Sequence, residues 1–213
     1  MKSILCIAFV IYSTSAAFCE IHINRILIDP EGNENSNAVP EIVVLANSGD
    51  DVVQLGGWAI KSTPPNDSPD FWVIPDGLSL GGQEEIAIYW HTPLNEEVNP
   101  IAGVPLINKP IITGKATTSL LNNDGGDLLL LDSLGIAKHY VQWSNNSQGL
   151  EAEAESAGIW TVGEYVERPG AGEWIVYDGE GYTEKDWRVE VIDEEIPTAI
   201  HQVTWSEIKN KKR

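Results

Sequence analysis

Oxygen-bearing side chains alternate along one glycine-containing segment near the start of the chain. In the run DPEGNEN they occupy every second position: Asp29, Glu31, Asn33 and Asn35. Carboxylate and amide oxygens at alternate positions of a loop are typical of calcium sites. The spacing does not fit an EF-hand, because Gly32 comes too early and no Glu closes a twelve-residue loop. A solvated surface loop explains the same residues, and we favour it over a calcium site.

A second run, DGEG, places Asp178 and Glu180 around a glycine and is the other calcium candidate. We favour a hairpin turn as its explanation. The histidines stand far apart in the sequence, without the spacing of a zinc motif, so zinc catalysis has no local support. They are His22, His91, His139 and His201. The chain has no Gly-x-Ser-x-Gly motif, and both of its cysteines lie in the first 19 residues.

The chain is strongly acidic, because 32 Asp and Glu residues outnumber 13 Lys and Arg residues and give a net charge of −19. Such a surface repels phosphate backbones, so nucleic-acid binding is not expected. A high net charge indicates solubility first and cation binding only second. A pair of catalytic carboxylates could stand anywhere among so many acidic residues. A hydrolase that uses loop carboxylates therefore stays an alternative.

The first 19 residues read as an export signal. Lys2 supplies a positive start, residues 4–12 are apolar, and small residues suited to cleavage follow, with cleavage expected after Ala17 or Cys19. The apolar run is far shorter than the roughly 20 residues that span a bilayer. We therefore expect a secreted protein, extracellular or periplasmic, with no transmembrane segment after cleavage and no disulfide in the mature chain.

Short β-strands are predicted along most of the mature chain. Each candidate strand is four to nine residues long and is bounded by Gly, Pro, Asn or Asp clusters. This pattern is typical of a β-sandwich or barrel. The predicted strands are residues 21–29, 42–45, 58–61, 71–75, 86–90, 128–131 and 138–143.

The remainder is predicted to be an extension and a tail. Residues 150–157 contain good helix formers and predict a short helix or turn. Residues 160–162, 173–177 and 187–192 again favour strands. We expect residues 146–192 to pack on the sandwich, because so much aromatic surface is not typical of a disordered segment. Residues 193–213 are predicted to be a polar tail with a short C-terminal helix.

Exposed aromatic rings are the remaining candidates for binding. Trp72, Trp90, Trp160 and Trp174 could form a face on which a sugar or peptide stacks. Tryptophans in a domain of this size more often pack in the core or at its edge. We favour packing for each of the four.

A series of motifs between residues 21 and 143 follows a fixed order. It begins with the strand INRI at 23–26, continues through Gly-Trp and Ile-Pro-x-Gly, and ends with an Asn-Gly-rich hairpin and a strand that closes on Trp. The positions that carry it are Glu41, Asn47, Gly57, Trp58, Pro75, Gly77, Asp127 and Trp143. Together they resemble the lamin tail domain of exported prokaryotic proteins. Arg25 and Val44 stand where that pattern often has acidic residues.

The resemblance implies an all-β, immunoglobulin-like antiparallel β-sandwich over residues 20–145, followed by the mixed C-terminal extension. It also implies an exported, non-enzymatic binding or structural module with no cofactor and with a protein or cell-surface partner. Two alternatives stay open beside it. One is a calcium-dependent adhesion module, and the other is the hydrolase named above.

Overall fold

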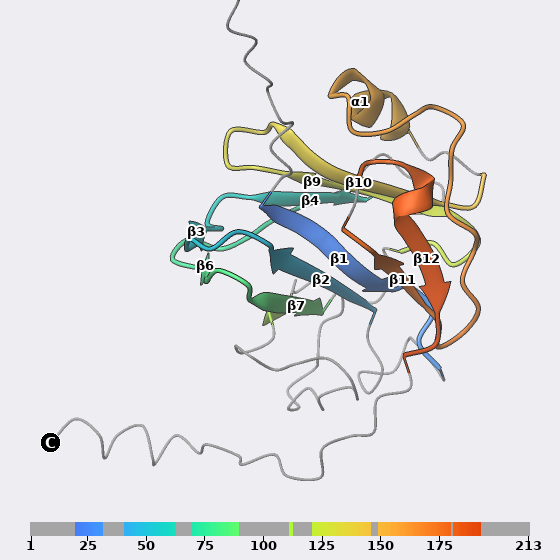
Figure 1. The fold of residues 1–213 in the computed structure, drawn as a ribbon, viewed down its shortest axis with the longest axis horizontal. Helices are drawn as coiled ribbons and strands as arrows, with labels where there is room; N and C mark the ends of the chain where they lie inside the picture. Colours follow the sequence, from blue (N-terminus) through green and yellow to red (C-terminus); the bar gives the residue numbers. More distant parts are fainter. Residues whose placement is uncertain are drawn as a thin grey trace, which may run out of the picture.

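The computed structural model describes residues 20–31, 41–62, 70–89, 111–112, 121–145, 149–179 and 181–192. The structure is mostly β, with 41% strand and 8% helix, which confirms the predicted all-β, sandwich-like class. The strands form two main sheets and one short two-stranded ribbon (Figure 1). The predicted export signal and the polar C-terminal tail lie outside the described residues.

The larger sheet has six strands in the order β12-β11-β1-β2-β7-β8. Neighbouring strands are antiparallel except β7 and β8, which run parallel. All six residues of β2 are buried, because this strand lies inside the sheet and apolar side chains cover both of its faces. The strand bounds are β1 Ile21–Leu27, β2 Ile42–Asn47, β7 Glu85–Tyr89, β8 Ile111–Ile112, β11 Trp174–Tyr177 and β12 Trp187–Glu190.

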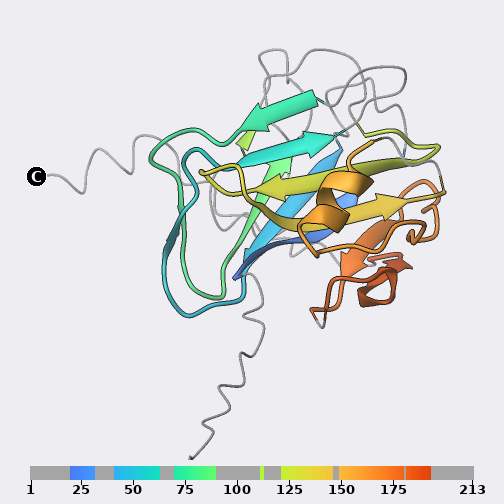
Figure 2. The same cartoon turned by 90° about the horizontal axis from the view of Figure 1, so that it is seen from above.

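The smaller sheet has four antiparallel strands in the order β10-β9-β4-β5 (Figure 2). Side chains from both sheets, such as Leu45 of the first and Leu130 of the second, belong to one hydrophobic cluster. The core therefore lies between two stacked layers. The bounds are β4 Ala59–Ser62, β5 Asp70–Val73, β9 Gly126–Leu131 and β10 Ala137–Trp143, and the ribbon pairs β3 Val53–Gln54 with β6 Ser79–Leu80.

Asn47 holds the turn that follows β2. Its side-chain amide donates to the carbonyls of Asp51, Leu80 and Gly81, and its oxygen accepts the N–H of Gly49. The side chain is almost fully buried, so these bonds satisfy its polar atoms away from water. Asn47 thus fixes the turn, as its sequence position predicts, and also ties that turn to the strand pair around β6.

The tryptophans of the motif fill the core. Trp58 is 8% exposed and Trp143 is fully buried. A Cβ atom on Gly126 would lie 2.7 Å from the Trp143 ring, so only glycine lets the ring close over β9. The Trp143 Nε1–H donates to the carbonyl of Asn122 at 2.8 Å, which satisfies the one polar atom of the indole.

The extension joins the sandwich in two ways. Strands β11 and β12 continue the six-stranded sheet beyond β1, and the helix α1 (Glu151–Ser156) packs against β10. The helix confirms the element predicted at 150–157. The strand predicted at 160–162 is wrong: this segment forms coil and a turn, and the carbonyl of Thr161 accepts the N–H of Glu164. A turn at Gly163 outweighs the local β propensity of this segment, and the φ of +87° at that position suits glycine.

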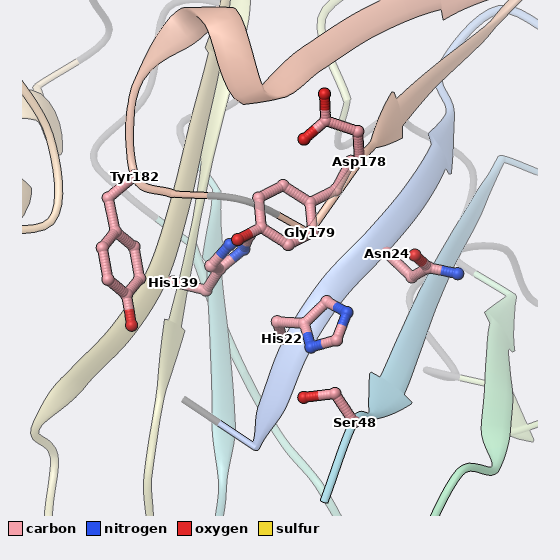
Figure 3. A pocket seen from close by; sticks show the side chains of 8 residues that line it. His22, Asn24, Ser48, His139, Asp178, Gly179 and Tyr182 are labelled. Atoms are coloured by element: carbon pink, nitrogen blue, oxygen red, sulfur yellow. The ribbon is translucent and has the colours of Figure 1, made fainter. Parts of the chain in front are cut away.

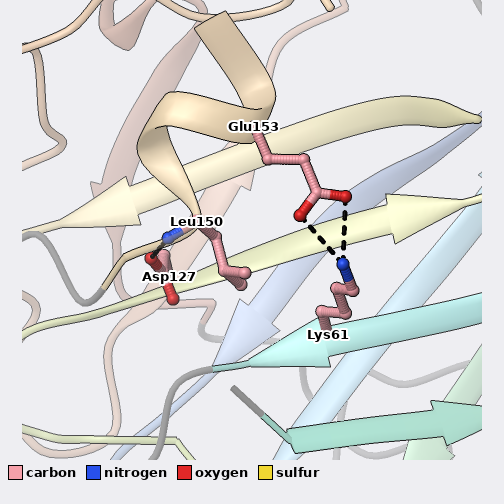
Figure 4. A network of polar contacts seen from close by, with 4 residues as sticks. All are labelled: Lys61, Asp127, Leu150 and Glu153. Carbon is pink, nitrogen blue, oxygen red and sulfur yellow. Dashed lines mark hydrogen bonds and ion pairs between the residues drawn. The ribbon is translucent and has the colours of Figure 1, made fainter. Parts of the chain in front are cut away.

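A buried carboxylate fastens α1 to the sheet (Figure 4). Asp127 of β9 is 0% exposed and accepts the N–H of Leu150 at 3.1 Å. The Tyr140 hydroxyl lies 3.5 Å from the same carboxylate and donates to Gln142 Oε1 at 3.0 Å. Burial, with the neighbouring charge of Asp127 as the next cause, raises the pKa of Tyr140 above its usual value. On the solvent side, Lys61 pairs with Glu153 of α1 at 2.8 Å.

No helix among the described residues has the length and hydrophobicity needed to cross a bilayer.

These contacts predict a large difference between two substitutions that both loosen α1. Asp127→Ala leaves the backbone N–H of Leu150 buried without its acceptor, and should lower the free energy of unfolding by about 2 kcal/mol. Lys61→Ala removes a partly exposed ion pair and should cost less than about 1 kcal/mol. Urea denaturation followed by tryptophan fluorescence measures both. Equal costs for the two variants would show that Asp127 does not fasten the helix.

Candidate binding pocket

A pocket opens where β11 leaves β1. The two strands pair only at Arg25 with Val176 and at Ile26 with Ile175. Continued in the same register, Ile23 would face Asp178, but the chain turns away at Gly179, whose φ is +88°. The gap is a pocket of about 240 Å³, which we call the fork pocket (Figure 3). Its lining residues are His22, Asn24, Ser48, His139, Tyr177, Asp178, Gly179 and Tyr182.

Both strands that supply the histidines are irregular beside the pocket. The register of β1 against β2 shifts between Ile23 and Arg25, so Asn24 falls in the irregularity and lines the pocket. The register of β10 against β9 shifts between Ala137 and His139. Bulges of this kind redirect side chains and are frequent beside functional sites. Here they bring together two histidines that are far apart in the sequence, with ring centroids 5.8 Å apart.

His139 replaces the missing strand partner of β1. The backbone N–H of Ile23 donates to His139 Nδ1 at 3.3 Å. Because Nδ1 accepts this bond, the neutral ring carries its proton on Nε2. The Nε2 atom is buried and has no hydrogen-bond partner. Burial, and next the nearby His22, hold the pKa of His139 well below its usual value.

Aromatic rings enclose His139 on several sides. The Tyr177 ring meets it edge-on, with centroids 4.6 Å apart and planes at 80°, and Trp187 lies at 5.3 Å and Tyr182 at 6.0 Å. Such geometry suits edge-to-face contacts and N–H···π interactions, which give a buried ring N–H a weak partner. The aromatic wall comes entirely from β11, β12 and the connection between them.

Several hydrogen-bond acceptors line the pocket. Burial lowers the pKa of His22, although a hydrogen bond to the Glu20 carbonyl opposes this, so the ring is neutral near pH 7 with one nitrogen free of its proton. Asn24 donates its amide to Glu85, and Tyr177 donates its hydroxyl to the Gly181 carbonyl at 2.7 Å. Burial raises the pKa of Tyr177 to about 12. Asp178 is exposed at the rim.

The two calcium candidates lie at different places in the described structure. Asp29 accepts the N–H of Gly172 through its backbone carbonyl, and the Glu31 side chain lies over the same glycine. Asp178 lies instead at the fork pocket, while Asn33, Asn35 and Glu180 lie outside the described residues. Within the described parts of the chain, no three His, Cys, Asp or Glu side chains are grouped so that they could hold a metal ion.

The tryptophans that the structure describes do not form an exposed aromatic face. Trp72, Trp160 and Trp174 are 8%, 5% and 4% exposed, so they pack in the interior, as we favoured. Trp90 lies outside the described residues. Of the motif positions, Glu41, Asn47, Trp58, Asp127 and Trp143 are buried, whereas Pro75 and Gly77 form an exposed turn. None of these positions lines the fork pocket.

One pair of carboxylates comes together elsewhere. A hydrogen bond to Glu184, and next partial burial, raise the pKa of Glu164 above its usual value. Glu184 belongs to the short helix η1 (Glu184–Asp186), which precedes β12. Neither residue lines the fork pocket.

Sequence reasoning missed the fork pocket because its residues follow no spacing motif. The histidines and the DGEG run are the sequence features that belong to the pocket, but their spacing in the sequence does not connect them. No known protein-family model matches this chain, and no curated protein matches it significantly. The geometry of the pocket is therefore the main evidence about what the protein does.

The neutral histidines predict a pH-dependent stability. Because the folded state lowers their pKa below 6.5, the unfolded chain binds more protons as the pH falls through that value. The free energy of unfolding should therefore fall as the pH drops from about 7.5 to about 5.5, by at most about 1.4 kcal/mol per pH unit for each histidine. Urea denaturation across this range measures the slope.

The variant His139→Gln should flatten that slope, and His22→Gln should flatten it less, because His139 is the more deeply buried. If His139→Gln does not fold, NMR titration of the His139 ring protons in the native protein tests the same prediction. A His139 ring that titrates at its usual pKa in the folded protein would contradict the prediction.

Proposed function

We propose that this protein is an exported, non-enzymatic binding module of the lamin-tail type, and that it holds a partner group in the fork pocket. One observation carries the proposal: β1 and β10 both break register at the pocket they line. These irregularities also bear on core packing, since the one in β1 keeps Ile23 and Ile26 in the same hydrophobic cluster. They redirect polar side chains into a cavity walled by rigid rings, which is the usual composition of a recognition site.

The size of the pocket supports recognition of a small group. Its volume of about 240 Å³ lies below the roughly 300–1,000 Å³ of pockets that enclose drug-sized ligands. A side chain, a sugar unit or a metabolite of a few heavy atoms fits this space. The lamin-tail part of the proposal rests on the order of the motifs, whose buried members Asn47, Trp58 and Trp143 build the sandwich that carries the pocket.

The two alternatives have narrower support. A hydrolase would use the Glu164–Glu184 pair, in which the pKa of Glu164 is raised, but this pair stands away from the fork pocket. Calcium-dependent adhesion would use the loop at Asp29 and Glu31. We favour the binding module because the fork pocket combines a cavity with converging polar groups, which neither alternative site offers.

Export is tested by localisation. The full chain with a C-terminal tag, expressed in a Gram-negative host, should be recovered outside the cytoplasm with a mass that fits cleavage after Ala17 or Cys19. A variant that lacks residues 2–19 should stay in the cytoplasm. Mass spectrometry of the fractions identifies both products. Uncleaved full chain in the cytoplasm would count against an exported module.

Binding is tested by NMR with a panel of small cationic, anionic and neutral compounds. We expect at least one class to shift the signals of His22 and Tyr182. Ser48→Trp, which fills the mouth of the pocket, should abolish the shifts, and Ala152→Trp on the exposed face of α1 should not. A panel that moves no pocket signal would overturn the proposal. The same sample should keep its Tm when calcium replaces a chelator, whereas a clear rise would favour the adhesion module.

A further inference from the structure

We propose that the fork pocket binds a primary ammonium group, from a free amine or from the lysine side chain of a partner protein. This inference rests on the proposed function, because it names the ligand class of the same site. Three observations carry it: Asn24, Tyr177 and His22 bring hydrogen-bond acceptors to the pocket, tyrosine rings line it, and no lysine or arginine of the described residues does so.

The N–H and O–H groups of these side chains already donate hydrogen bonds within the protein, so the acceptor atoms of the same side chains remain for a ligand. The Asn24 amide nitrogen donates to Glu85 at 2.6 Å, which leaves its carbonyl oxygen on the acceptor side. The Tyr177 hydroxyl donates to Gly181, so its oxygen lone pairs remain for a ligand. The neutral ring of His22 adds a nitrogen lone pair. An ammonium group carries three donors and no acceptor, so it complements this set.

The rings and the charge favour the same ligand. Tyr177 and Tyr182 present aromatic rings to the pocket, and a cation over such a ring gains cation–π attraction. Asp178 places a carboxylate at the rim, where Figure 3 shows it across the pocket from Ser48. The net charge of −19 attracts cations over longer distances.

An anion is the main competing ligand, because two buried donors, His139 Nε2 and Trp187 Nε1, lack hydrogen-bond partners. Both atoms are sealed from solvent, however, and His139 lies among aromatic rings. An anion would have to displace these rings to reach the donors. It would also approach the Asp178 carboxylate, which repels it.

The test compares three probes of equal length by NMR titration of the purified protein: n-butylammonium, n-butanol and butyrate. We expect n-butylammonium to shift the signals of His22, Asn24 and Tyr182, with weaker binding at high salt. Asp178→Asn should weaken this binding about tenfold, because it removes one charged hydrogen-bond partner. Glu155→Gln makes the same change of charge on the exposed face of α1 and should leave binding unchanged.

The source of the ammonium is separated by two capped peptides, one with a lysine and one with its Nε-acetylated form. Binding of the lysine peptide alone supports a partner protein, and binding of n-butylammonium without the lysine peptide supports a free amine. Shifts by butanol or butyrate that match or exceed those of n-butylammonium would overturn the inference and leave the binding module intact. Equal weakening by Asp178→Asn and Glu155→Gln would also overturn it. If none of the probes shifts a pocket signal, both the ammonium inference and the proposed binding module would be overturned.

Discussion

The backbone N–H of Ile23 must find an acceptor at the point where β11 leaves β1, and this constraint organises the rest of the site. A buried N–H without a partner costs roughly as much as a lost hydrogen bond, so the fold has to supply one. The His139 imidazole does so from the opposite sheet. Because Nδ1 must accept this hydrogen bond, the His139 ring is neutral and carries its proton on Nε2. The same bond connects the two sheets at the point where β11 separates from β1.

That arrangement explains why the extension is part of the sandwich rather than an appendage. His139 needs cover from solvent, and the rings of Tyr177, Tyr182 and Trp187 provide it. These rings come from a hairpin that meets β1 over only two residue pairs. Asp127 fastens the preceding segment by accepting the N–H of Leu150. The sandwich therefore supplies the histidines, and the extension supplies the aromatic wall.

Most of the fold could be predicted from the sequence because its causes are local. Apolar runs such as 42–45 and 128–131 are buried strands, and Asn47 holds a turn, as their patterns indicate. The strand predicted at 160–162 failed because a glycine with positive φ favours a turn there. The pocket could not be predicted, since it depends on register shifts at Asn24 and before His139, and the sequence pattern of a strand does not show which residue will bulge.

The two histidines have different physical roles although they share a cluster. His139 is sealed, so its role is to satisfy β1 and to support the rings, and its charge state is set by burial. His22 is slightly more exposed than His139, and burial lowers its pKa more than the hydrogen bond to Glu20 raises it. A positive charge on His22 would stand beside the acceptors that we propose recognise a cation, and would compete for them. The burial that keeps His22 neutral therefore also keeps the pocket free of an internal positive charge, which the proposed binding of an external cation requires.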